Sequence, residues 1–213
     1  RAVNAQALVS AEVRQMGDNI SVGFRLFDVV SGQPQGDGMQ FDARATDWRR
    51  AAHKIADQIY ARLTGEQPYF DSRVAFVQET GPKDARIKRI GVMDYDGQNI
   101  LWMTDSASLV LAPQFSRDGR RLAYTSFDSG FPQIRVMEVA TVTSRAMTQD
   151  ANSMAFSPRF SPDGRWIASA RDGNVWVRPR DGGEAFALTD DAEPTTSGTS
   201  NTQAPSSAPT EKP

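Results

Sequence analysis

One turn motif occurs twice in this chain, and the distance between its copies constrains the fold more than any other feature. The chain reads PQFSRDG at residues 113–119 and PRFSPDG at residues 158–164, which is 45 residues later. A motif that returns at a fixed period of about 20 to 50 residues is the sequence signature of a repeat architecture. The repeat therefore predicts a fold assembled from similar units.

The similarity extends beyond the turn. The segment IGVMDYDGQNILWMTD aligns with IRVMEVATVTSRAMTQD, so that Met103 matches Met147. A third copy, VWVRPRDGGEAFALTDD, places Thr189 on Thr148. Hairpins such as PQFSRDGRRLAYTS precede the later copies, which makes each unit about 40 to 45 residues of four short strands, the size of a β-propeller blade.

The N-terminal part of the chain, residues 1–66, is organised differently. Apolar and polar residues alternate in ALVSAEVRQ and ISVGFRLFDV, the turn residues MGDN lie between them, and MQFDAR can form a third strand. The period then changes to three and four residues between Trp48 and Leu63, with Thr46 or Asp47 placed to cap a helix and Gly65 placed to end it.

These patterns predict an α+β protein in three parts. Residues 1–66 form a small antiparallel sheet with one helix, and residues 67–191 form an incomplete all-β propeller of about three four-stranded blades. Residues 192–213 are rich in Ser, Thr and Pro, contain no apolar residue larger than alanine, and are expected to be disordered.

Several acidic residues sit in turns and have two possible roles. Asp118 and Asp163 of the repeated motif could bind a metal, but an aspartate in such a turn usually bonds to its own backbone. Asp94, Asp96 and Asn99 in DYDGQN resemble a calcium loop without the spacing and the distal Glu of a specific one, so a two-residue Asp-Gly hairpin is the preferred interpretation.

A short basic segment, RIKRIGV, precedes that loop and alternates Arg86 and Lys88 with isoleucine. Basic side chains commonly protect exposed strands from pairing with other chains. We interpret the segment as a solvated blade edge.

Composition removes several classes of function. The net charge of −2 gives no electrostatic footprint for nucleic acid, and no apolar run approaches the roughly 18 residues of a membrane span. There is no cysteine, and the single His53 is expected to be a partly exposed helix residue without a chemical role. We expect no nucleic-acid partner, no membrane insertion, no metal and no cofactor. No G-x-S-x-G, phosphate-loop or H-E-x-x-H motif is present, so we expect no catalysis.

Four stretches carry a resemblance to a known family: DWRRAAHKIADQIYARLTGEQPYFDSRVAFVQETGP, RIKRIGVMDYDGQNILWMTD, LVLAPQFSRDGRRLAYTSFDSGFPQIRVMEV and MAFSPRFSPDG. In their residues and in their order along the chain, these stretches resemble the TolB family, whose members are periplasmic proteins of the Tol-Pal system. The resemblance runs from about Ala5 to Ala168. It implies an N-terminal α/β domain, a six-bladed propeller and non-catalytic protein binding that supports outer-membrane integrity and cell division.

The resemblance also implies partners and a site. In the family the propeller docks the lipoprotein Pal, while the extreme N-terminus engages TolA; this chain begins inside the family's N-terminal domain, so we do not expect TolA binding. The Pal-facing surface includes loops before the F-S-P-D-G strand, which assigns partner binding to Met154 and Ser157, and to Pro113 one blade earlier. Four aromatic residues are expected to pack, mostly in the blade core, or to contact the partner: Tyr95, Trp102, Phe127 and Phe131.

Two alternatives remain open from the sequence. The F-S-P-D-G-R-W-I-A run at residues 160–168 also occurs in the accessory propeller of prolyl-oligopeptidase-like serine peptidases, and this chain could be a fragment of one. It could also be a truncated product that does not fold alone, since a propeller removes its exposed strand edges only by closing.

Overall fold

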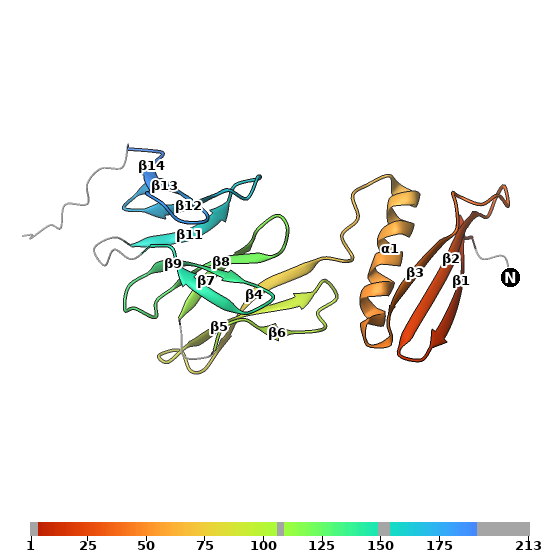
Figure 1. Cartoon of the computed structure of the whole chain (residues 1–213), viewed down its shortest axis with the longest axis horizontal. Helices are drawn as coiled ribbons and strands as arrows, with labels where there is room; N and C mark the ends of the chain where they lie inside the picture. The colour runs from red at the N-terminus through yellow and green to blue at the C-terminus, as the bar shows by residue number, and fades with distance from the viewer. Residues whose placement is uncertain (1–3, 106–108, 149–153, 191–213) are drawn as a thin grey trace, which may run out of the picture.

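The structure is a computed structural model that describes residues 4–105, 109–148 and 154–190. Among the described residues there are one α-helix and four sheets. Figure 1 shows the helix lying on one small sheet at one end of the molecule and the other sheets at the opposite end, with a short connection between them. The Ser/Thr/Pro-rich segment expected to be disordered, residues 192–213, lies outside the described residues.

The N-terminal body is an antiparallel sheet of order β1-β2-β3 followed by a helix. Its elements are β1 (Ala7–Met16), β2 (Asn19–Asp28), β3 (Met39–Arg44), the 3₁₀ turn η1 (Ala45–Asp47) and α1 (Trp48–Thr64). Gly65 ends the helix in the left-handed conformation, and its N–H donates to the Ala61 carbonyl at 2.9 Å, as its position predicted. Asp47 occupies the N-cap position but its side chain makes no capping hydrogen bond.

The helix packs on β2 and β3, where Phe24 and Leu26 are buried. β1 is exposed over almost its whole length, and Val13 is 66% exposed. The alternation of apolar and polar residues in β1 predicts a half-buried strand, and this prediction is wrong, because α1 packs on β2 and β3 and leaves β1 exposed.

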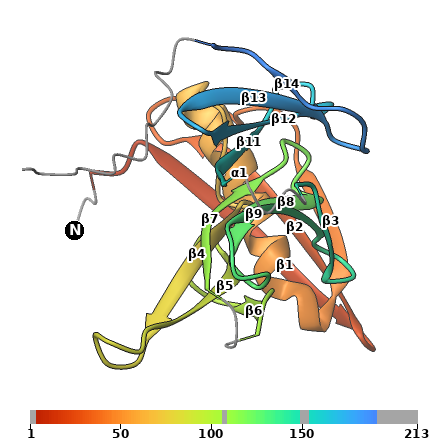
Figure 2. The same cartoon turned by 90° about the vertical axis from the view of Figure 1, so that its left-hand side faces the viewer.

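Three antiparallel sheets form the propeller part, and we call them blade 1, blade 2 and blade 3 in chain order. Blade 1 comprises β4 (Arg73–Thr80), β5 (Ile87–Asp94) and β6 (Leu101–Trp102); blade 2 comprises β7 (Val110–Phe115), β8 (Arg121–Ser126), β9 (Gln133–Glu138) and β10 (Thr143–Ala146); blade 3 comprises β11 (Ala155–Phe160), β12 (Trp166–Arg171), β13 (Asn174–Pro179) and β14 (Phe186–Ala187). The blades follow one another side by side (Figures 1 and 2), with β4 and β11 both next to β7. Blade 1 has three strands where four were expected.

The repeat seen in the sequence is a repeat of hydrogen bonds in the structure. In every blade a backbone N–H donates to the hydroxyl of a threonine 14 residues later. The three bonds are Ile90 to Thr104 (2.9 Å), Ile134 to Thr148 (2.9 Å) and Val175 to Thr189 (3.0 Å). The same side-chain clasp therefore ties β5, β9 and β13, which occupy equivalent places in the repeat, to the ends of their units.

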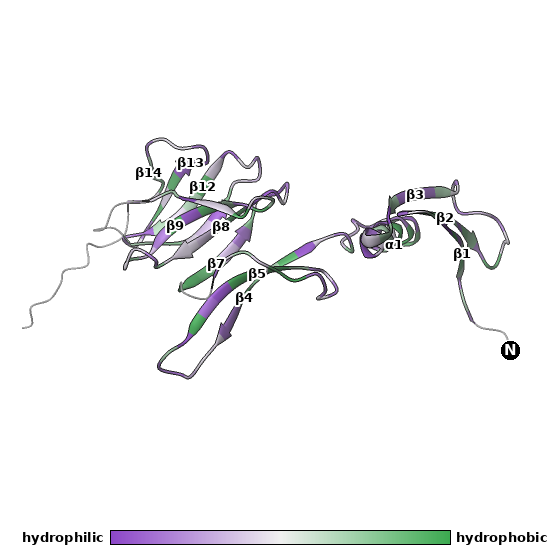
Figure 3. Ribbon diagram, turned by 60° about the horizontal axis from the view of Figure 1, so that its bottom comes forward, coloured by the Kyte–Doolittle hydropathy of each residue, from purple (hydrophilic) through white to green (hydrophobic). Residues whose placement is uncertain are grey.

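Two apolar clusters hold the blades together. Strands alternate hydrophobic and hydrophilic residues, as the colouring of β5 in Figure 3 illustrates. One cluster joins blades 1 and 2 and includes Ile90, Val92, Leu122, Tyr124 and Met137, and the other joins blades 2 and 3 and includes Ala123, Ile134, Met147, Ala155 and Ile167. The predicted fold class, a small helix-and-sheet unit followed by an incomplete propeller, is confirmed.

The basic segment RIKRIGV covers residues 86–92, most of which belong to β5. β5 pairs with β4 along its whole length but with β6 only at Gly91 and Val92, so among the described residues no strand pairs with the other side of residues 87–89. Arg86 and Lys88 each contact Glu79 at 3.3 Å, and the Arg89 guanidinium lies 3.4 Å from the centre of the Trp102 ring. These basic side chains therefore lie at the end of β5 that β6 does not cover, and they pair there with acidic and aromatic neighbours in blade 1.

Candidate partner-binding surface

The first strands of blades 2 and 3 share an unusual backbone conformation. Ala112 in β7 and Ser157 in β11 both have a φ of 51°, and the pairing register shifts at each of them. A β-bulge of this kind bends its strand and redirects the neighbouring side chains. The 45-residue repeat thus places equivalent bulges next to each other, at the strands that carry the predicted site.

The three residues predicted to bind a partner lie on these strands and beside them. Met154 immediately precedes β11 and is 55% exposed. Ser157 lies inside β11, and its N–H donates to the Thr125 hydroxyl of blade 2 at 3.2 Å. Pro113 lies inside β7, directly after the bulge, and its repeat equivalent Pro158 is fully buried. Two of the three residues therefore belong to strands rather than to the loop that the sequence suggested.

The repeat also identifies a residue that the sequence reasoning missed. Leu109 precedes β7 by the distance at which Met154 precedes β11, and it is 40% exposed. Its carbonyl accepts the Phe127 N–H at 3.0 Å, and the Phe127 ring lies 6.3 Å from that of Phe156. We call Leu109, Phe127, Met154 and Phe156 the rim surface. The 45-residue period, applied to Met154, was the signal that could have found Leu109.

The other predicted aromatic residues lie elsewhere. Phe131 lies in the loop between β8 and β9 and is half-buried, whereas Tyr95 and Trp102 belong to blade 1. The Tyr95 ring packs against Tyr69 and Phe70, each at 5.5 Å. None of the four is among the buried core residues, so the expectation that most of them form the blade core is wrong. Ring pairs hold Tyr95, Trp102 and Phe127 instead.

The aspartates of the repeated turn bond within the turn, which confirms the structural interpretation. The Ser161 hydroxyl donates to Asp163 at 2.6 Å, and the Arg165 N–H donates to the same oxygen at 3.0 Å. These donors hold the pKa of Asp163 well below its ordinary value. Ser116 and Asp118 repeat the arrangement one blade earlier, also at 2.6 Å. The turns therefore use their carboxylates to close hairpins.

The loop between β5 and β6 connects the propeller to the helix. It comprises residues 95–100, which is longer than the two-residue hairpin expected, and Asn99 donates to Asp94 at 2.6 Å. Asp96 accepts hydrogen bonds from Arg49 and His53 of α1. Burial raises the pKa of Asp96, but the Gln98 N–H and the Arg49 and His53 side chains outweigh it and leave this pKa below its ordinary value.

His53 thus has a role that the sequence did not predict. Its Nε2 lies 3.2 Å from the Asp96 carboxylate, and its side chain is only 14% exposed. A lone histidine on a helix gives no sequence signal for a partner 43 residues away. Within residues 4–105, 109–148 and 154–190, no group of three or more His, Cys, Asp or Glu side chains is placed to hold a metal ion. In the same ranges no helix is long and apolar enough to cross a membrane.

Comparison with known proteins identifies the family. The model of the TolB β-propeller domain matches residues 60–210, and that of the TolB amino-terminal domain matches residues 1–35. The Tol-Pal system protein TolB of Roseobacter denitrificans is 53% identical over 156 residues, which are 73% of this chain and 35% of that protein. The TolB of a Jannaschia species is 54% identical over 158 residues, with 73% and 36% covered.

The structural comparison agrees with the sequence comparison. The crystal structure of TolB from Acinetobacter baumannii matches with a TM-score of 0.78 and 26% identity, over 88% of this chain and 47% of that chain. This chain spans about a third of the length of the curated relatives that it matches. The propeller model alone covers more than half of the chain, and the sequence identity favours these relatives over the peptidase alternative. The chain belongs to the TolB family.

Proposed function

We propose that this chain is a non-catalytic protein-binding scaffold of the Tol-Pal system in the periplasm, with the lipoprotein Pal as its partner. Through that contact it would support outer-membrane integrity and cell division. The observation that carries the proposal is the rim surface, where Leu109 and Met154 expose apolar side chains at equivalent places on adjacent blades. Family membership supplies the system in which such a surface would act.

The rim surface is suited to binding because its support is rigid. The bulge at Ser157 is held by the hydrogen bond to Thr125, which is itself buried at 1% exposure. Pro158 follows the bulge and is fully buried. A surface that is already ordered loses little conformational entropy when a partner docks, so more of the contact energy remains as affinity.

Met154 is the residue to change first. The substitution Met154→Asp places a charge at the most exposed apolar position of the rim surface, and removal of a central apolar contact typically weakens a protein interface by about tenfold or more. Because Met154 is already exposed, the melting temperature should stay unchanged. Calorimetric titration of the full chain with the soluble domain of Pal measures the affinity, and thermal unfolding monitors the fold.

The matched control is Met16→Asp. Met16 is 64% exposed at the tip of the β1–β2 hairpin, far along the chain from blade 3, so it receives the same chemical change without touching the rim surface. We expect normal Pal affinity for Met16→Asp. Equal affinity for both variants and the unchanged chain, or no Pal binding by the unchanged chain, would contradict the proposal.

A further inference from the structure

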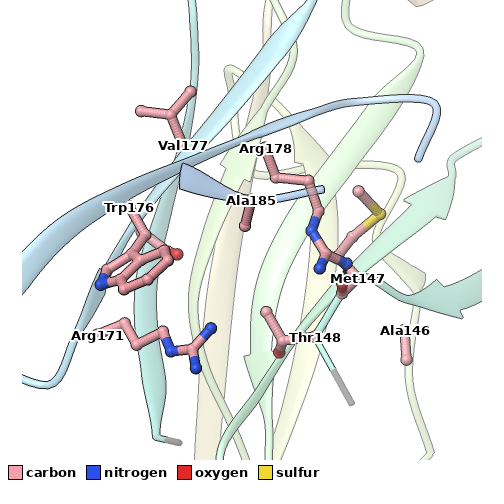
Figure 4. Close-up of a pocket in the computed structure, with 9 residues that line it drawn as sticks. Ala146, Met147, Thr148, Arg171, Trp176, Val177, Arg178 and Ala185 are labelled. Atoms are coloured by element: carbon pink, nitrogen blue, oxygen red, sulfur yellow. Dashed lines mark hydrogen bonds between the residues drawn. The ribbon is translucent and has the colours of Figure 1, made fainter. Parts of the chain in front are cut away.

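A pocket of about 340 Å³ lies between blades 2 and 3, apart from the rim surface. Met147 and Thr148, at the end of blade 2, form one wall. Arg171 from β12 and Trp176 and Arg178 from β13 form the opposite wall. Figure 4 shows the guanidinium groups of the two arginines turned toward the same space, with Thr148 between them.

The pocket exists because blade 3 departs from the repeat at two positions. Strand pairing makes Ser169 the equivalent of Tyr124 and Arg178 the equivalent of Met137. Tyr124 and Met137 are each 3% exposed and fill the interface between blades 1 and 2. In blade 3 the tyrosine ring is replaced by a hydroxymethyl group and the methionine by a cation. The first change opens space, and the second lines it with positive charge.

The charge on Arg178 is incompletely satisfied. One Nη donates to the Met147 carbonyl, while Nε is buried and has no hydrogen-bond partner among the described residues. No carboxylate of the described residues forms an ion pair with it. Arg178 as a whole is half-buried, and a partly desolvated guanidinium is stabilised by an anionic partner, because desolvation without pairing is unfavourable.

The neighbouring side chains add charge and shape. Arg171 lies 4.5 Å from the centre of the Trp176 ring and pairs with Asp172 at 3.4 Å. The Thr148 oxygen accepts the Ile134 N–H, which leaves its own O–H available as a donor. The side chains of Trp176, Val177 and Ala185 provide an apolar wall.

We propose that this pocket binds a carboxylate. The Arg178 guanidinium holds the carboxylate oxygens, and the apolar wall receives the small organic group attached to the carboxylate. The planar donor fork of arginine matches the two oxygens of a carboxylate. A free small acid and the C-terminus of a peptide share this chemistry, and the test separates the two sources.

The probe is N-acetylalanine, compared with N-acetylalanine amide, which lacks only the charge. The chain has four tryptophans, so its indole N–H groups give a small set of NMR signals, and Trp176→Phe identifies the one from the pocket. We expect N-acetylalanine to shift the Trp176 signal saturably at constant ionic strength. The amide should leave it unmoved. Equal shifts with both compounds, or with matched sodium chloride, would overturn the proposal.

Two variants test the assignment to this pocket. Arg178→Met copies the buried Met137 of the preceding interface, so the blade should fold, and loss of a hydrogen-bonded charge should weaken N-acetylalanine binding by about tenfold or more. Ser169→Tyr copies Tyr124 and should abolish binding by filling the pocket. Arg120→Met removes an exposed arginine outside the pocket and is the control. Unchanged affinity in Arg178→Met, with the fold intact by circular dichroism, would refute the role of Arg178.

A neutral hexapeptide with a free C-terminus, and the same peptide amidated, distinguish the sources. If the peptide with the free C-terminus binds and the amidated peptide does not, or if the former binds more tightly than N-acetylalanine, the pocket recognises peptide C-termini. If N-acetylalanine binds and both peptides fail, the pocket takes small acids. Absence of saturable binding by any carboxylate would overturn the inference, and this outcome is independent of Pal binding at the rim surface.

Discussion

The hydrogen bond from a backbone N–H to a threonine hydroxyl recurs in the three blades, so it can be removed at a buried donor and at an exposed one and the two costs compared. Thr104→Val deletes the hydroxyl that accepts the Ile90 N–H and keeps the shape of the side chain. Ile90 is fully buried, so its N–H is left without water as a substitute partner. Thr189→Val deletes the equivalent bond at Val175, which is 38% exposed, together with the bond that the Thr189 hydroxyl donates to the Asn174 side chain.

The two substitutions should therefore differ in cost. An unsatisfied buried donor costs about 1–3 kcal/mol, so Thr104→Val should lower the free energy of unfolding by that amount. At the exposed site water replaces the hydroxyl, and Thr189→Val should stay within about 0.5 kcal/mol of the unchanged chain. The expected difference between the variants is about 1–2 kcal/mol in favour of Thr189→Val.

Urea denaturation followed by circular dichroism measures both values, provided that the m-values of the three proteins agree. Hydrogen exchange of the Ile90 amide in the unchanged chain gives a second measurement, because this amide should exchange only through larger openings. Equal destabilisation by Thr104→Val and Thr189→Val would refute the argument, since burial of the donor would then have no effect.

Two further outcomes follow from local geometry. Asp163→Asn should destabilise the chain at pH 7. The hydrogen bond from Ser161 lowers the pKa of Asp163 in the folded chain, so the ionised carboxylate stabilises the fold at a pH above the ordinary aspartate pKa of 3.8. This stabilisation is lost as the carboxylate becomes protonated, so the difference in stability between the two proteins should shrink as the pH falls below 3.8. Gly91→Ala should cost about 1–3 kcal/mol, because the added carbon would lie 2.6 Å from the Phe76 ring and 3.0 Å from the Trp102 ring.

Each of these predictions has a control and an outcome that contradicts it. Gly23→Ala adds the same carbon in β2, where its nearest neighbour is 3.9 Å away, and should be close to neutral. Equal losses of stability in Gly23→Ala and Gly91→Ala would exclude crowding of the added carbon as the cause. For Asp163→Asn, urea midpoints measured from pH 7 to pH 3 suffice, and a stability difference that stays constant over this range would contradict the assigned role of the carboxylate.

Local chemistry explains why the repeat could be read correctly from the sequence. Ser161, Asp163 and Gly164 form their hydrogen bonds within a few residues, so the motif specifies its hairpin wherever it occurs. Gly65 ends α1 for a similarly local reason. The prediction failed where burial depends on the packing of distant elements. β1 has the alternation of a half-buried strand, but the helix packs on β2 and β3, so β1 stays exposed.

The candidate sites also differ in whether they depend on local patterns or on the packing of distant residues. Met154 and Ser157 could be proposed from the sequence, and the period would have added Leu109. The contact between His53 of α1 and Asp96 of the propeller could not be predicted from the sequence. The two residues are 43 positions apart, and neither belongs to a motif that indicates a partner. Contacts of that kind depend on how separate elements pack.

The sequence by itself determined the repeat, the turn chemistry, the family and the division into a helix-and-sheet unit followed by blades, because each depends on short-range patterns. Only the tertiary structure decided that Ser169 and Arg178 replace the packing pair Tyr124 and Met137, since that substitution has meaning only when two blades lie face to face. The same packing decided which exposed side chains form the rim surface. Short-range bonding can be read along the chain, whereas burial and unpaired charge are properties of surfaces that the chain brings together from distant positions.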